Sequence, residues 1–123
     1  MQVDIFLITS SHSPGKTKKA WYRYILVCGG RSVTGKGELT ATTGHRLVLT
    51  CAIEALRRMT RPSMVTVHTD CRYLISNHMA EWAAAGWKRP GGELKNADLW
   101  EELYGLQKNH AVRYHFENMD KYG

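Results

Sequence analysis

The spacing of hydrophobic residues in the first half of the chain predicts three strands and a helix. Runs rich in β-branched and aromatic residues at 3–9, 21–28 and 32–40 predict strands, and Gly29-Gly30 forms a turn between the last two. Apolar residues then recur at steps of three and four from Val48 to Met59, which predicts an amphipathic helix capped by the Thr42-Thr43-Gly44 segment. The first half therefore predicts an antiparallel meander followed by a helix.

The second half predicts strands that alternate with helices. Residues 64–69 form a β-branched run, and a helix is expected from Cys71 toward His78 or Trp82. Residues 86–92 contain one proline and three glycines and predict a loop, after which Asn96 can cap another helix. A last strand is expected at 112–116. The order βββαβααβ predicts an α/β fold with a five-stranded mixed sheet and helices on both faces.

Asp70 is the most informative single residue, because it follows the buried strand 64–69 directly. Open α/β sheets bind ligands at the carboxyl ends of their strands, where a carboxylate usually works with others. The alternative is that Asp70 caps the helix that begins at Cys71, a contact worth about 1 kcal/mol. The function of Asp70 therefore depends on which acids lie near it.

Composition favours one soluble, intracellular domain. The chain of 123 residues is 43% hydrophobic, which fits a single domain over residues 1–123 with its own core. Three cysteines without metal-binding spacing predict free thiols in a reducing cytoplasm. The start of the chain predicts a strand and not a signal peptide, and no apolar run approaches the ~20 residues that cross a bilayer.

The charge is positive and unevenly distributed. The formal net charge is +6, and residues 1–36 hold six basic side chains against the single acid Asp4. This segment could face a polyanion. A solvated basic surface that aids solubility is the alternative, and composition alone does not separate the two.

The segment SSHSPGKT at 10–17 is close to a phosphate-binding loop of the form GxxxxGK[ST], with Ser10 in place of the first glycine. That loop must open a helix whose N-terminus faces the phosphates. Because the following residues predict a strand, nucleotide hydrolysis is not expected. The lysines of the segment could still contact phosphate oxygens.

Several strings together resemble type 1 ribonuclease H over nearly the whole chain. They are VDIF at 3–6, TTGHRLVL at 42–49, HTDCRYL at 68–74, GWK at 86–88 and KNADLW at 95–100, in the family's order and similar spacing. The resemblance implies a ribonuclease H-like sheet that binds RNA/DNA hybrids. It also implies RNA-strand hydrolysis by two Mg²⁺ ions held by four carboxylates, since two such ions must share anionic oxygens.

Position by position, the resemblance implies that most of this carboxylate set is replaced. The family's first Asp matches Ile8, its Glu matches Val48, and only its third carboxylate is kept, as Asp70. The fourth lies on a final helix, which is expected to be missing because the chain stops at Gly123. The family's Lys-Gly-His loop is replaced by residues 118–120. Glu117 and Asp120 are the acids best placed to assist Asp70.

A nucleic-acid surface is expected to combine basic and aromatic side chains. Trp82 and Trp87 beside Lys88 and Arg89 match the family's basic helix and loop that grips the hybrid, although packing beneath a loop is the alternative. Trp100 is expected in the core. The six histidines show no ligand spacing on one helix, so we expect them at the surface or in contact with site residues, and not as metal ligands. The remaining predicted contacts to phosphates and sugars are Lys16, Lys18, Lys19, Thr43 and Arg46.

Three functions follow from these residues. The first is a catalytically inactive domain that binds RNA/DNA hybrid or another duplex, with no cofactor. The second is a residual hybrid ribonuclease around Asp70, which alone would need Mg²⁺ or Mn²⁺. The third is an interaction domain in which a protein partner or a second copy covers the surface left by the missing helix.

Overall fold

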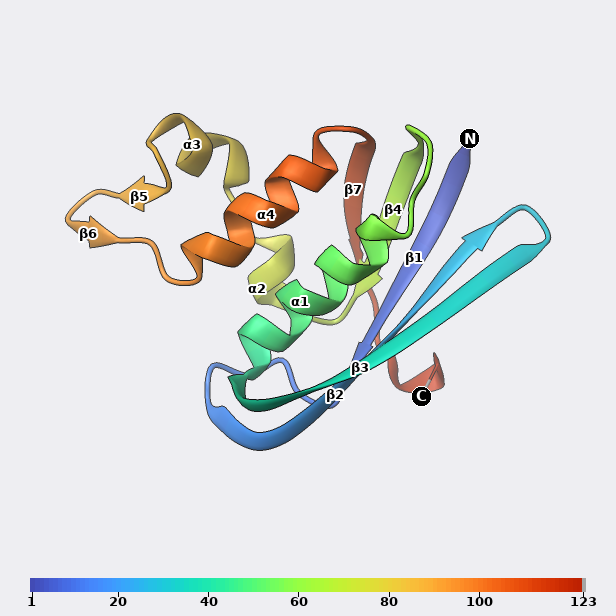
Figure 1. Ribbon diagram of the computed structural model, residues 1–123, viewed down its shortest axis with the longest axis horizontal. Coiled ribbons are helices and arrows are strands. Elements are labelled where there is room, and N and C mark those ends of the chain that lie inside the picture. The colour runs from blue at the N-terminus through green and yellow to red at the C-terminus, as the bar shows by residue number, and fades with distance from the viewer. Residues whose placement is uncertain (123) are drawn as a thin grey trace.

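The computed structural model describes residues 1–122 and contains a five-stranded sheet in the order β3-β2-β1-β4-β7 (Figure 1). Strands β1 (Gln2–Thr9), β2 (Lys16–Cys28) and β3 (Arg31–Thr43) form an antiparallel meander. Strands β4 (Met64–Thr69) and β7 (Ala111–Phe116) run parallel to β1. The predicted mixed sheet is therefore confirmed, with β1 joining its two halves. The last residue of the predicted domain, Gly123, lies outside the described residues.

In residues 1–122, four α-helices connect the strands or pack beside them (Figure 1). Helix α1 (Gly44–Arg57) follows β3, and α4 (Ala97–Gln107) precedes β7 and packs against α1. Helices α2 (Arg72–Ile75) and α3 (Met79–Ala84) lie between β4 and α4. The 3-10 helix η1 (Asp120–Tyr122) follows β7.

The core forms between α1 and one face of the sheet. Val3, Ile5 and Leu7 alternate along β1 and are at most 5% exposed, and they join Leu49 of α1 and the fully buried Trp100 in one cluster. Burial of these side chains is the main source of stability, and Trp100 is in the core as predicted. The other face of β1 carries Asp4 and Phe6, which alternate with the core residues.

The short helix η1 reaches this other face. The Tyr122 ring lies 4.7 Å from the Phe6 ring, and the Arg23 guanidinium donates to the Tyr122 carbonyl oxygen. Helices were expected on both faces of the sheet. Within the described residues, the α-helices cover one face and the short helix η1 lies on the other. Most of the second face is therefore open.

The prediction of one helix from Cys71 toward His78 or Trp82 is wrong, because the structure contains α2 and α3 separated by a break. The Asn77 side chain donates to the Leu74 carbonyl oxygen at 2.8 Å and accepts from the Met79 N–H at 3.3 Å. Such side-chain bonds to the backbone compete with helical hydrogen bonds. The predicted loop 86–92 also contains part of a short hairpin, formed by β5 (Lys88–Arg89) and β6 (Gly92–Glu93).

The two helix caps predicted from acidic and amide side chains are also wrong. The residue that precedes α2 is Cys71, whose N–H is accepted by the Thr69 hydroxyl at 3.0 Å, so Asp70 is not the cap. Asn96 precedes α4 in a left-handed conformation with φ of 61°, and its side chain makes no capping bond. It bonds instead to Arg46 and Tyr73. Thr43 does cap α1, by accepting the Arg46 N–H at 3.1 Å.

The phosphate-loop-like segment 10–17 leads directly into β2, as predicted. No helix N-terminus therefore follows it to face a phosphate. Within the described residues, no helix combines the length and the apolar character needed to cross a bilayer.

Candidate functional site

Asp70 lies at the carboxyl end of β4, beside the carboxyl end of β1. The parallel register pairs Phe6 with His68, and two further residues along each strand lead to Ile8 and Asp70. The Asp70 side chain is 28% exposed, and its Oδ1 lies 3.9 Å from His12 Nε2. The position is open enough for a ligand, so its chemistry depends on the neighbouring side chains.

Two positions where the family resemblance implies carboxylates carry hydrocarbon side chains instead. Ile8 is 4% exposed and Val48, on α1, is 1% exposed. Neither side chain has a lone pair to donate, whereas hard divalent ions bind oxygen. Within residues 1–122, Asp70 belongs to no group of three ligand-bearing side chains close enough to share an ion. These residues do not fit a pair of Mg²⁺ ions.

The remaining acids do not complete a site at Asp70. Glu54 pairs with Arg57 at 2.7 Å, and Glu38 pairs with Lys19 at 3.5 Å. Glu117, which was expected to assist Asp70, turns toward His68, where its Oε1 lies 3.1 Å from Nδ1. The carboxylate predicted as a helper therefore belongs to a different cluster.

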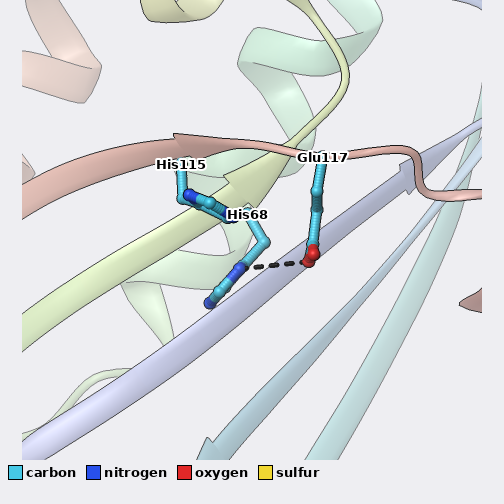
Figure 2. A group of neighbouring side chains, drawn as sticks. All are labelled: His68, His115 and Glu117. Carbon is cyan, nitrogen blue, oxygen red and sulfur yellow. Dashed lines mark ion pairs between the residues drawn. The ribbon is translucent and has the colours of Figure 1, made fainter.

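That cluster consists of His68, His115 and Glu117, and we call it the His-His-Glu group (Figure 2). One potential ligand atom from each residue lies within 4.8 Å of the other two. This group is not apparent from ligand spacing along one helix, because its members lie on two strands and the residue after one of them. Strand position could have indicated the group. His68 and His115 each lie one residue before the end of a strand, and the two strands are adjacent, parallel and in register at these residues.

The surroundings of His68 hold its ring in place. Its Nε2 lies 2.8 Å from Asp4 Oδ1, and its ring stacks on Phe6 with centroids 4.3 Å apart. The Tyr122 hydroxyl donates to Glu117 Oε1 at 3.1 Å, and Lys121 Nζ lies 3.5 Å from Oε2. Burial acts to raise the pKa of Glu117, but Tyr122, Lys121 and His68 outweigh it and the pKa lies below its usual value. Glu117 is therefore a carboxylate at neutral pH.

The predicted lysine contacts gather where β2 begins. Lys16 pairs in register with Thr43, the residue that caps α1, so the start of β2 lies beside the start of that helix. Lys16 and Lys18 are exposed, and within residues 1–122 neither has a carboxylate within 4.0 Å. Lys19 pairs with Glu38, and Thr43 is 9% exposed with its hydroxyl engaged in the cap. Lys16 and Lys18 are thus the freest of these groups to meet a phosphate.

Arg46, the other predicted contact near the start of α1, has partners on the neighbouring helix. It makes two hydrogen bonds to Asp98, NH1 to Oδ1 at 3.1 Å and NH2 to Oδ2 at 2.9 Å, and a third to Asn96 Oδ1 at 3.1 Å. Its first role in the structure is therefore to join α1 to the start of α4.

The predicted aromatic contacts are partly buried against α4. The Trp82 ring lies 5.2 Å from the Trp100 ring, and Trp87 lies 5.7 Å from Tyr104 in an edge-to-face arrangement. Lys88 and Arg89 are exposed on the β5–β6 hairpin, which extends outward from α3 and α4 (Figure 1). The two basic residues are accessible to a ligand. The two tryptophan rings are partly buried and pack against α4, where they stabilise the helical layer.

The three cysteines are free thiols. Burial raises the pKa of Cys51 and of Cys71, so both thiols stay protonated and unreactive at neutral pH. Cys28 is only partly buried.

The sheet order, the helices and the carboxylate at the end of β4 define a ribonuclease H-like α/β fold. The ribonuclease H family model matches residues 4–117. Ribonuclease H of Cupriavidus necator is 33% identical over 117 residues, which cover 92% of this chain and 81% of that protein. Ribonuclease H of Cupriavidus metallidurans is 40% identical over 96 residues, covering 75% and 66%. The chain therefore belongs to the ribonuclease H family.

Solved structures agree with this assignment. LC9-RNase H1, a type 1 RNase H with the type 2 active-site motif, superposes with a TM-score of 0.76 at 26% identity, covering 97% of this chain and 64% of that one. LC11-RNase H1, solved in complex with an RNA/DNA hybrid, has a TM-score of 0.66 at 11% identity, covering 97% and 87%. The predicted family and fold are confirmed.

Proposed function

We propose that this ribonuclease H-family domain binds nucleic-acid duplexes, RNA/DNA hybrid foremost, and does not cleave them. The observation that carries the absence of cleavage is that Ile8, on β1, and Val48, on α1, are buried hydrocarbon side chains at two positions where the family resemblance implies carboxylates. Hydrolysis by two metal ions needs several anionic oxygens in one place. A lone carboxylate leaves binding as the function of the surface, without a requirement for Mg²⁺ or Mn²⁺.

The duplex-binding surface that we propose runs from the start of β2 to the β5–β6 hairpin. Lys16 and Lys18 at one end and Lys88 and Arg89 at the other are exposed, and both ends project on the left of Figure 1. Basic side chains bind phosphates, and the binding weakens as salt competes. Support for the choice of duplex comes from the fold shared with LC11-RNase H1, which was solved with an RNA/DNA hybrid.

Fluorescence anisotropy with labelled hybrid, double-stranded RNA and double-stranded DNA at several salt concentrations tests the binding. Affinity is expected to fall by about 0.9 log unit per log unit of salt for each phosphate neutralised. Lys16→Glu/Lys18→Glu should weaken binding at least tenfold. Arg31→Glu/Arg61→Glu is the matched control, because it changes the charge equally at the far end of the sheet. Salt-independent binding, or equal losses in both variants, would contradict the proposed surface.

A cleavage assay on the hybrid with Mg²⁺ and with Mn²⁺ tests the absence of catalysis. The protein and Asp70→Asn should both give no product above a blank. Product that depends on Asp70 would overturn this part of the proposal and support the alternative, a residual hybrid ribonuclease. Because binding and cleavage are measured in separate assays, the absence of binding and the presence of cleavage can be told apart.

A second candidate function, interaction with a protein partner or a second copy of the chain, is favoured by two exposed apolar side chains. Met64 is 58% exposed and Trp21 is 46% exposed, and both lie on the sheet face opposite α1. The two side chains lie near opposite ends of that face, Met64 beside Gln2 and Trp21 beside Ser10, so each offers a partner a separate apolar contact. Light scattering that shows only monomers across a range of concentrations would remove the homodimer.

A further inference from the structure

The His-His-Glu group is assembled by the sheet itself and does not involve Asp70. His68 on β4 and His115 on β7 are register partners, and Glu117 continues from β7 with its N–H on the Thr69 carbonyl oxygen at 3.0 Å. Figure 2 shows the three side chains on the same side of these strands, with Glu117 reaching toward His68. Backbone pairing therefore fixes the three Cα positions, and only the side chains need to adjust to a ligand.

The spacing within the group suits a small cation. Two ligands of a tetrahedral zinc ion lie about 3.3 Å apart, given metal–ligand bonds of about 2.0 Å. His68 Nδ1 and Glu117 Oε1 are 3.1 Å apart, so a shared ion needs almost no change there. The third ligand atom lies within 4.8 Å of both, and His115 is exposed and free to rotate inward.

The surroundings of His68 Nδ1 give a second reason. Nε2 lies 2.8 Å from Asp4 Oδ1, which holds the ring with Nδ1 toward Glu117. Within the described residues, Nδ1 is buried and makes no hydrogen bond, although Glu117 Oε1 lies 3.1 Å away. Buried polar atoms without a partner are uncommon in folded proteins, and a metal ion between Nδ1 and Glu117 would satisfy both atoms.

The carboxylate on the far side of His68 matches what metal-binding histidines usually have. A ligating imidazole generally donates its other N–H to a carboxylate or carbonyl, which fixes the ring and strengthens it as a ligand. Asp4 and the stacked Phe6 ring provide this support here. The donor set of two imidazole nitrogens and one carboxylate oxygen suits zinc-like ions, whereas Mg²⁺ and Ca²⁺ prefer oxygen alone.

We propose that His68 Nδ1, His115 and Glu117 bind one Zn²⁺-class ion, with Asp4 orienting the His68 ring. The fourth position faces solvent beside His115 and takes a water molecule. Three protein ligands with one open position are the arrangement in which zinc stays accessible to a further ligand. This site does not rest on the proposed duplex binding, because it shares no side chain with the proposed duplex-binding surface.

Calorimetric titration of the metal-free protein with Zn²⁺, and visible absorption with Co²⁺ as a probe, test the site. One equivalent is expected to bind, with the visible bands of four-coordinate Co²⁺. A Cys28→Ser background excludes a contribution from the most accessible thiol. Bound Zn²⁺ should also raise the melting temperature of the protein, a readout that needs no activity.

Variants separate the proposed site from surface binding. His115→Ala should abolish the titration, and Asp4→Asn should weaken it about 10- to 100-fold, because Asp4 only orients a ligand. His78→Ala is the matched control, since it removes an exposed histidine outside the group. Undiminished binding in His115→Ala would overturn the proposal. So would the absence of Zn²⁺ binding by the unmodified protein.

Discussion

The guanidinium of Arg46 holds both carboxylate oxygens of Asp98, which joins the first turn of α1 to the first turn of α4. The resemblance to ribonuclease H predicts that Arg46 contacts phosphate. In the structure its guanidinium is bonded to Asp98 instead. A phosphate would have to compete with Asp98 for the same donors. The same guanidinium therefore stabilises the packing of α1 against α4 and would be needed to bind a phosphate.

A double-mutant cycle of Arg46→Ala and Asp98→Ala measures this pair. Both side chains are more than a third exposed, so we expect a coupling of about 0.2–1 kcal/mol in the free energy of unfolding. The hydrogen bond to Arg46 lowers the pKa of Asp98 below its usual value. The coupling should therefore be full above pH 3.8 and should be lost as the pH falls through the lower pKa of the folded state. A coupling that is the same at pH 7 and pH 2 would contradict this.

His45 should make the folded state less stable in mild acid. Its ring stacks on Tyr73 at 3.7 Å, and burial, with the nearby Lys95 and His12, lowers its pKa below the ordinary 6.5. As the pH falls below 6.5 the unfolded chain gains this proton first, so the free energy of unfolding falls. In His45→Phe, which keeps the stacking, the decline between pH 7 and pH 5 should be shallower. The same replacement at exposed His78 is the control, and an equal change there would contradict the assignment.

The Tyr73 hydroxyl should stabilise the junction of α2 with α4. It accepts from Trp100 Nε1 at 3.1 Å and from Asn96 Nδ2 at 3.0 Å. Tyr73→Phe leaves the buried indole N–H without a partner, which we expect to cost about 1–3 kcal/mol in urea unfolding. Tyr104→Phe is the control, because Tyr104 contributes its ring to Trp87. Equal stability of Tyr73→Phe and the unmodified protein would show that water replaces the hydroxyl.

Carboxylates introduced at Ile8 and Val48 should destabilise the protein. Ile8→Asp and Val48→Glu place charges where the side chains are 4% and 1% exposed, and each should cost about 3 kcal/mol or more. Mg²⁺ should recover part of the loss in the double variant, because it neutralises three carboxylates together with Asp70. Ile8→Asn/Val48→Gln is the uncharged control, which should show no response to Mg²⁺. No recovery with Mg²⁺ would mean that the three positions do not converge.

Much of the fold could be predicted from the sequence because local patterns determine it. The strand 64–69 was predicted with the bounds of β4, since its β-branched run and the flanking Pro62 leave little choice. The split of 71–82 could not be predicted from periodicity, because it depends on two bonds made by the Asn77 side chain. Asn96 likewise has the sequence of a cap, but its tertiary partners Arg46 and Tyr73 take its side chain.

Part of the candidate site could also be predicted from the sequence, and part could not. The position of Asp70 at the end of a strand follows from the pattern alone, as does the apolar character of Ile8 and Val48. The grouping of His68 with His115 does not, because the two are 47 residues apart in the sequence and meet only through parallel pairing of β4 with β7. Recognising it requires the strand register as well as the residue types.

We expect the long β2–β3 hairpin to form before the parallel strand pairs. The twelve register pairs from Lys16 to Cys28 join residues that are closer in sequence, so loop closure costs less there. Pairing β1 with β4, and β4 with β7, closes longer loops, and such contacts are expected to form later in folding. The histidines of β4 and β7 would then come together after the hairpin has formed. A ligand bound between them should therefore slow unfolding and leave the folding rate almost unchanged.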